Sequence, residues 1–115
     1  KYGISKRSYP NLDIKNLTRS EAIAIYKRDY YDRLGVGEIS DLRLAYHYFD
    51  MGVNAGVGRA KQLMVKAMEI ADKNPDAELW KIYRDLREQF YKSIATGQKA
   101  KFLAGWLKRV NYNLA

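Results

Sequence analysis

Hydrophobic residues recur through most of the chain at the three- and four-residue spacing that predicts amphipathic α-helices. Five stretches show this pattern, over residues of about 18–34, 41–55, 57–72, 75–96 and 98–112. No stretch alternates apolar and polar residues as a half-buried strand would. We therefore predict an all-α fold, built as a bundle of about five helices.

The ends of several predicted helices carry recognisable capping residues. Thr18 opens a T-R-S-E capping box, in which the threonine and the glutamate satisfy each other's backbone amides. Ser40 or Asp41 is predicted to cap the second helix, and Gly56 can end it in a left-handed conformation. Pro75 follows an asparagine and is predicted at the first position of the fourth helix.

Apolar residues at helical spacing define the predicted core. The buried positions expected in the second helix are Leu42, Ala45, Phe49, Gly52 and Val53. Those expected in the last helix are Phe102, Leu103, Trp106, Leu107 and Val110. Residues 1–17 form a predicted loop, which is expected to attach to the core through Ile4, Tyr9, Leu12, Ile14 and Leu17.

Polar residues on the second predicted helix are the first candidates for chemistry. Asp50 and Asn54 are four residues apart and share one helix face. Periodicity alone favours a structural role for both, as buried polar groups bonded to neighbouring backbone. His47 is the only histidine and has no partner at catalytic motif spacing, so we interpret it as a packing or surface residue.

Composition limits the class of protein. The 115 residues are enough for one domain with a real core, and 47% of them are hydrophobic, which excludes a disordered chain. There is no cysteine and no apolar run long enough to span a bilayer. No dinucleotide fingerprint, Walker loop or metal-ligand spacing is present, so neither a cofactor nor a metal is expected.

The formal charge of +8 favours a polyanionic partner. Nucleic acid, an acidic membrane surface and bacterial wall polymer all have this character. The basic residues occur in short groups spread along the chain, with no block of five or more. Charge alone therefore does not choose among these partners.

Four segments, taken in order, resemble one known family. Residues 2–5 read YGIS, and residues 25–31 read IYKRDYY, where the family has I-Y-x-x-D-Y-W. Residues 49–56 read FDMGVNAG, which matches F-D-x-x-V-N-x-G. Residues 102–110 read FLAGWLKRV, which is similar to F-L-x-G-W-L-x-R-V. The chain thus resembles glycoside hydrolase family 108, with Tyr31 in place of the family's usual tryptophan.

The resemblance implies a lysozyme-like, mostly helical fold and N-acetylmuramidase activity on bacterial peptidoglycan. Members occur as phage endolysins and as proteins labelled secretion activators. Residues 1–56 would be the C-terminal part of the hydrolase region, and residues 57–115 a peptidoglycan-binding helical segment packed with it as one globular unit. The protein would act on the cell wall from the periplasm, from outside the cell, or as a phage product released through a pore.

The resemblance also implies where the catalytic residues lie. In the family an E-G-G motif that carries the general acid precedes Y-G-I-S, which here begins at Tyr2. The catalytic acid is therefore expected before Lys1, and this chain alone is expected to have little or no hydrolase activity. The residues expected to bind substrate or to line the cleft are Tyr2, Ser5, Tyr30, Tyr31, Asp50 and Asn54.

Two other functions remain open at this point. A basic helical domain could bind nucleic acid, but no recognition motif is evident and the basic residues do not gather on one predicted face, so no nucleic-acid partner is expected. A non-catalytic wall-binding module would keep affinity for peptidoglycan without cleaving it. Retention on purified sacculi, with or without cleavage, distinguishes these functions.

Overall fold

The computed structural model describes residues 1–112, apart from the side chains of residues 97–99. Its α-helices are α1 (Arg19–Tyr26), α2 (Leu42–Ala55), α3 (Val57–Lys73), α4 (Leu79–Ile94) and α5 (Leu103–Val110). A π-helical segment, η1 (Lys27–Asp32), continues α1, and two 3₁₀ segments are η2 (Val36–Glu38) and η3 (Gly97–Phe102). No strand occurs within residues 1–112, so the predicted all-α fold is confirmed. The last three residues of the predicted wall-binding segment, 113–115, lie outside the described residues.

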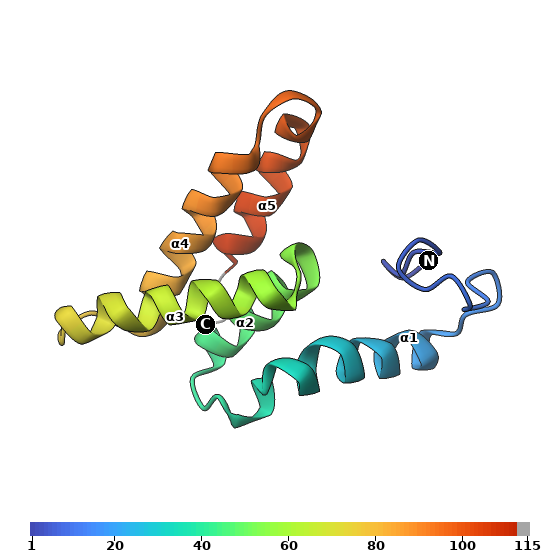
Figure 1. The fold of residues 1–115 in the computed structure, drawn as a ribbon, viewed down its shortest axis with the longest axis horizontal. Coiled ribbons are helices and arrows are strands. Elements are labelled where there is room, and N and C mark those ends of the chain that lie inside the picture. Colours follow the sequence, from blue (N-terminus) through green and yellow to red (C-terminus); the bar gives the residue numbers. More distant parts are fainter. Residues whose placement is uncertain (113–115) are drawn as a thin grey trace.

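The helices form a bundle with an arm (Figure 1). Helices α2, α3 and α4 pack on one another, and α5 packs on α4. Helix α1 and η1, together called the arm, run beneath α2 as one long rod. The N-terminal loop lies at the far end of this rod. The radius of gyration, 15.4 Å, exceeds the roughly 13 Å of a compact domain of this length, in keeping with the extended arm.

Two separate hydrophobic clusters hold the two parts. The main core contains eleven buried residues from the end of the arm and from α2 to α5, among them Met51, Ala60, Tyr83 and Tyr91. The N-terminal cluster contains Ile4, Leu17, Ala22 and Ile25, with Tyr9, Leu12 and Ile14 packed against it. The predicted anchoring of the loop is therefore correct, but the anchor is the first turns of α1 rather than the main core.

Several predicted helix ends are confirmed. Thr18 accepts the amide of Glu21, and the Glu21 carboxylate accepts the amide of Thr18, which completes the capping box. Asp41 caps α2 by accepting backbone amides, including that of Arg43 at 2.9 Å. Gly56 has φ of 96°, and this single residue separates α2 from α3. Glycine adopts such a φ without steric cost.

The predicted start of the fourth helix is wrong. Asn74 ends α3 instead, and its side-chain amide donates to the carbonyl of Ile70 at 2.8 Å. The residue at the N-cap position of α4 is Glu78, and it makes no side-chain capping hydrogen bond. Residues 75–77 form a turn, and α4 begins at Leu79.

The predicted buried face of α2 is rotated from the true one. Gly52 is buried as predicted, but Leu42 is 75% exposed, and the other buried residues are Leu44, His47, Tyr48 and Met51. Helices α3 and α4 cover that second set, and the arm covers the Phe49 side only in part. Phe102, predicted on the inner face of the last helix, is 50% exposed.

Gly52 allows the arm to cross α2 closely. A Cβ atom at this position would overlap the side chain of Leu34, which follows η1. Leu34 is itself buried in the main core. The small residue therefore fixes the point at which the arm meets α2, and the cleft described below opens beside that point.

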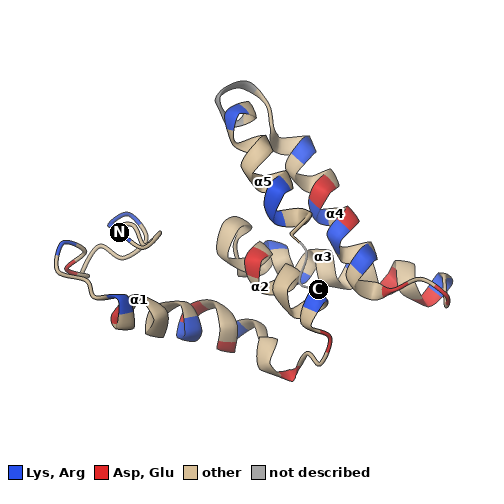
Figure 2. Ribbon diagram, turned by 180° about the vertical axis from the view of Figure 1, so that it is seen from behind, with Lys and Arg blue, Asp and Glu red and all other residues tan. Residues whose placement is uncertain are grey.

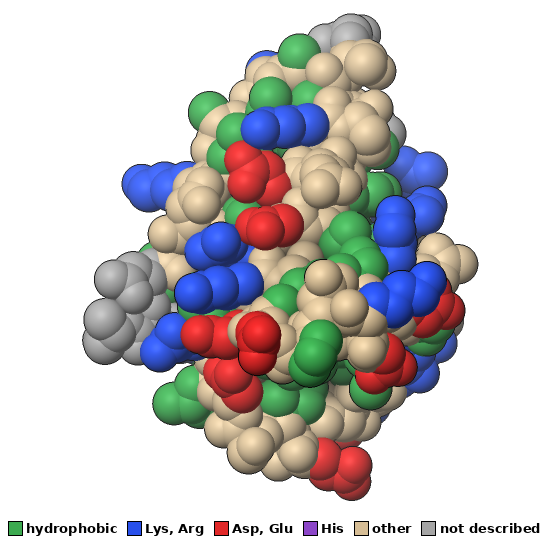
Figure 3. Space-filling view, turned by 90° about the vertical axis from the view of Figure 1, so that its left-hand side faces the viewer, with side chains coloured by type: hydrophobic (Ala, Val, Ile, Leu, Met, Phe, Trp, Pro, Cys, Tyr) green, Lys and Arg blue, Asp and Glu red, His purple; other side chains and the backbone are tan. Residues whose placement is uncertain are grey.

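Charged residues are distributed over the helices rather than gathered on one. Figure 2 shows Lys and Arg on the arm and on α3, α4 and α5, with acidic residues between many of them. In the space-filling view of Figure 3, basic, acidic and apolar side chains alternate across one face. None of the helices described within residues 1–112 is long and apolar enough to cross a membrane.

Candidate functional site

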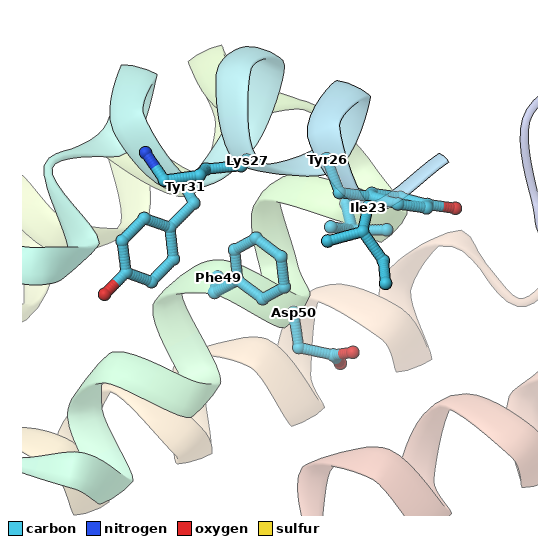
Figure 4. A pocket seen from close by; sticks show the side chains of 7 residues that line it. Ile23, Tyr26, Lys27, Tyr31, Phe49 and Asp50 are labelled. Atoms are coloured by element: carbon cyan, nitrogen blue, oxygen red, sulfur yellow. The ribbon is translucent and has the colours of Figure 1, made fainter. Parts of the chain in front are cut away.

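A cleft lies between the arm and α2 (Figure 4). Its volume is about 630 Å³, and its lining is mostly apolar. The arm contributes Ile23, Tyr26, Lys27 and Tyr31, and α2 contributes Phe49, Asp50 and Val53. A mostly apolar concavity with a few polar groups is the usual form of a ligand site.

Aromatic rings form one end of the cleft. Tyr31 and Phe49 meet edge to face, with ring centroids 6.0 Å apart. Tyr31 belongs to the π-helical segment, a feature that is frequent at functional sites. Ile23, 58% exposed, faces the same space from α1. Flat apolar faces of this kind suit the faces of sugar rings.

Asp50 is the polar group of the cleft. Its side chain projects from α2 beside Phe49 (Figure 4) and is 20% exposed. Asp50 is the only carboxylate among the residues that line this cleft within the described part of the chain. One of its oxygens accepts a hydrogen bond from Arg87 Nη2 at 2.5 Å.

Arg87 comes from α4 and is fully buried, with 0% of its side chain exposed. Its Nη1 atom donates to His47 Nδ1 at 2.8 Å, and Nη2 also donates to the hydroxyl of Tyr91 at 3.2 Å. The Nε atom has no hydrogen-bond partner among the described residues. A buried charge is tolerated only when it is paired, so the buried Arg87 guanidinium depends on Asp50 as its counter-ion.

His47 is the second titratable group of this network. Burial lowers its pKa to about 4, and the positive charges of Arg87 and Arg84 act in the same direction. Because a guanidinium only donates, His47 Nδ1 must accept, and the ring is neutral with its proton on Nε2. His47 packs against Trp80, which confirms its packing role; 2% of it is exposed.

Asn54 also meets an arginine from the C-terminal half. Its side-chain oxygen accepts a bond from Arg109 Nη1 at 2.5 Å. Its amide donates to the backbone carbonyl of Asp50 at 2.8 Å. Asn54 is therefore held between α2 and α5 and is not part of the cleft lining.

Tyr2 and Ser5 lie on the N-terminal loop, away from the cleft lining. The backbone carbonyl of Tyr2 accepts a hydrogen bond from the Tyr26 hydroxyl at 2.8 Å, and Tyr26 does line the cleft. Ser5 bonds Ser8 within the loop at 3.2 Å. The structure thus links Tyr2 to the cleft through one side chain and leaves Ser5 apart.

Tyr30, the neighbour of Tyr31, does not line this cleft. It lines a separate groove with Tyr9, Asp29 and the Gly56 turn. The guanidinium of Arg28 and the hydroxyl of Tyr9 hold the pKa of Asp29 at about 2. Of the six predicted site residues, the structure brings Tyr31 and Asp50 into one cleft and places the other four outside its lining.

Sequence reasoning missed Arg87. In α4 it stands four residues after Tyr83 and four before Tyr91, both of which are buried. An arginine in the middle of a buried stripe signals a counter-ion on a facing helix, and Asp50 is that counter-ion. This signal is present in the amino-acid sequence, but only the packing of the helices identifies Asp50 as the partner.

The chemistry that this cleft can perform follows from its groups. Asp50, paired with a cation, can act as a carboxylate toward a developing positive charge or a water molecule. One of its oxygens already accepts a hydrogen bond from the Arg87 guanidinium, which only donates. Residues 1–112 contain no group of three or more acidic or histidine side chains that could hold a metal ion.

Comparisons with known proteins agree with the resemblance in the sequence. The family model described as Glycosyl hydrolase 108 matches residues 1–56, which include the arm, α2 and every residue that lines the cleft. No curated protein and no solved structure matches the chain significantly. Over residues 1–56, the chain is therefore similar to the glycosyl hydrolase 108 family.

Proposed function

We propose that the protein acts as an N-acetylmuramidase, hydrolysing the glycan strand of bacterial peptidoglycan at the cell wall. The family match over residues 1–56 carries this proposal, since a glycosyl hydrolase takes a glycan substrate. The cleft between the arm and α2 supports it, because all of its lining residues fall within the matched range.

In this proposal the cleft binds the sugar chain and stabilises charge. Tyr31 and Phe49 offer their ring faces and edges to a sugar, and Asp50 presents a carboxylate beside them. Glycoside hydrolysis also needs a carboxylic acid that protonates the leaving oxygen. The resemblance assigns that acid to an E-G-G motif that precedes Tyr2, and we propose that Tyr2 and Ser5 contact this motif.

A second candidate function is wall binding without cleavage. It is favoured by a groove of about 570 Å³ beside α5, where exposed aromatic rings alternate with cations. Phe102 and Tyr112 are 50% and 59% exposed there, next to Lys101, Lys108 and Arg109. Such a surface would attract the anionic groups of the wall, with an affinity that falls as salt rises.

A sacculus assay tests the first proposal against the second. The chain is compared with a form extended at its N-terminus through the expected E-G-G motif, with turbidity and new reducing ends as readouts. Release of reducing muramic-acid ends by the extended form alone would support the muramidase proposal. Binding of both forms without cleavage by either would support wall binding.

The same assay has an outcome that contradicts both proposals. If neither form is retained on sacculi at low salt, peptidoglycan is not the partner of this chain. Retention on DNA would then be measured, although the mixed charge visible in Figure 3 gives no support for a nucleic-acid surface.

A further inference from the structure

A second, smaller pocket lies where the first turn of α2 meets the first turns of α4 and the end of α5. Its volume is about 190 Å³, below the range of sites for drug-sized ligands. Its lining is formed by Arg43, His47, Trp80, Arg84, Val110, Asn111 and Tyr112. It shares no lining residue with the cleft beneath the arm.

Trp80 organises the cations of this pocket. The guanidinium carbons of Arg43 and Arg84 lie 4.9 and 5.1 Å from the centre of its ring. His47 stacks on the same indole, with an interplanar angle of 10°. Stacking on an aromatic ring engages the flat face of a guanidinium and leaves its N–H edge free to bind an anion.

The local charge is strongly positive. Arg43 makes no ion pair within residues 1–112, and Arg84 pairs only through Nε, at 3.2 Å from Asp85. Three other acids are engaged: Glu78 accepts from Trp80 Nε1, Asp50 accepts from Arg87, and Asp41 accepts the backbone amide of Arg43. No carboxylate lines the described pocket.

The low pKa of His47 reflects its burial and the positive charge around this pocket. His47 is 2% exposed, accepts a hydrogen bond from Arg87 and lines the pocket together with Arg84. Both charges contribute to the low pKa of its ring, after burial itself. An anion bound between Arg43 and Arg84 would offset the positive charge that acts on His47.

We propose that this pocket binds a small carboxylate that carries a short apolar group, as at the end of an alanine-terminated peptide. Arg43 and Arg84 would hold the carboxylate through their free N–H edges. The ring of Tyr112, which is 59% exposed, supplies apolar surface beside them, which inorganic anions would not use. Identification of the group as a peptide stem of peptidoglycan rests on the proposed function, but carboxylate binding does not.

The only histidine of the chain makes the test direct. The pKa of His47 is measured from its imidazole proton resonance in the presence and absence of N-acetyl-D-alanine. We expect the ligand to raise this pKa in a saturable manner, because an added negative charge favours the protonated ring. The uncharged amide of the same compound should leave the pKa unchanged.

The decisive variant is Arg43→Gln combined with Arg84→Gln. Its charge-matched control is Arg7→Gln combined with Arg19→Gln, two exposed residues far from the pocket in the chain. The first pair should abolish the ligand-induced rise, and the control pair should retain it. A His47 pKa that does not respond to the ligand, or that responds equally in both variants, would overturn the proposal. An equal rise with inorganic phosphate would overturn its preference for a carboxylate.

Retention on sacculi then identifies the source of the carboxylate. If the Arg43/Arg84 variant is retained less well than its control, the source is a peptide stem of the wall. If both are retained equally while only the control binds N-acetyl-D-alanine, the ligand is a free carboxylate. Failure of sacculus binding by the unmodified chain would contradict the proposed function. Carboxylate binding by the pocket would then be decided by the His47 titration alone.

Discussion

Arg87 of α4 donates a hydrogen bond at 2.5 Å to the carboxylate of Asp50 of α2. One partner lies outside the range that matches the family model, and the other lines the cleft within it. The residue that pairs with the carboxylate of the cleft therefore comes from the C-terminal half. Asn54, also within the matched range, likewise accepts a hydrogen bond from a residue of the C-terminal half, Arg109.

Removal of Asp50 alone should be more damaging than removal of the whole ion pair. Asp50→Ala leaves a fully buried cation without a partner, and we expect a loss of about 3 kcal/mol in the free energy of unfolding. The double variant with Arg87→Met removes that cation and should recover part of the loss. Urea denaturation of the two single variants and the double variant measures the coupling. Additive losses would show that the pair does not act as a unit.

His47 should make the protein sensitive to mild acid. Its pKa is about 4 in the folded chain and 6.5 as a free group, so the unfolded chain binds a proton first as the pH falls. The contribution of neutral His47 to the free energy of unfolding is therefore fully present above pH 6.5. It is lost as the pH falls toward 4, by about 3 kcal/mol at most.

His47→Gln provides the control for this pH dependence. Its amide remains neutral, so its stability should change less between these pH values than that of the unmodified chain. Thermal unfolding at a series of pH values compares the two. Parallel curves would assign the acid sensitivity to other groups.

Gly56 and Gly58 should respond oppositely to alanine. At Gly56, φ of 96° strains any other residue, and Gly56→Ala should cost about 1–2 kcal/mol, although no atom would touch the new Cβ. Gly58 is exposed within α3, and Gly58→Ala should stabilise by about 0.4–1 kcal/mol. Unfolding midpoints of both variants are compared with that of the unmodified chain. A stabilising Gly56→Ala would contradict the conformation described.

Tyr30 and Tyr31 are adjacent but face different grooves, so they distinguish the side of the arm that binds glycan. Tyr31→Ala should lower retention on sacculi about two- to tenfold, as the loss of one aromatic contact would. Tyr30→Ala serves as the neighbouring control and should lower it less. If Tyr30→Ala lowers retention more than Tyr31→Ala does, the glycan binds in the groove beside Gly56 instead.

Local sequence signals predicted the helices well and their packing less well. The capping box at Thr18 and the break at Gly56 depend on nearby residues only, and both are found as predicted. The buried face of α2 depends on which helices cover it, and Leu42 was placed wrongly for that reason. The π-helical segment that carries Tyr31 has no signal in the spacing of apolar residues.

The candidate site shows the same limit. Asp50 was identified from its segment, but its partner Arg87 lies 37 residues further along the chain. Helical periodicity places a residue on a face and does not say what lies opposite. Asn54 was expected at the floor of a cleft, and its link to Arg109, 55 residues away, follows only from the packing of α5 on α2.

The division of the apolar residues into two clusters has a consequence for motion. The N-terminal cluster is small, and its buried members all lie within the first 25 residues, whereas Leu34 anchors the other end of the arm in the main core. Small clusters open at lower free energy than large ones. Amide hydrogens of α1 should therefore exchange with solvent faster than those of α2 and α4. Since α1 forms one wall of the cleft, such opening would widen the cleft without unfolding the bundle.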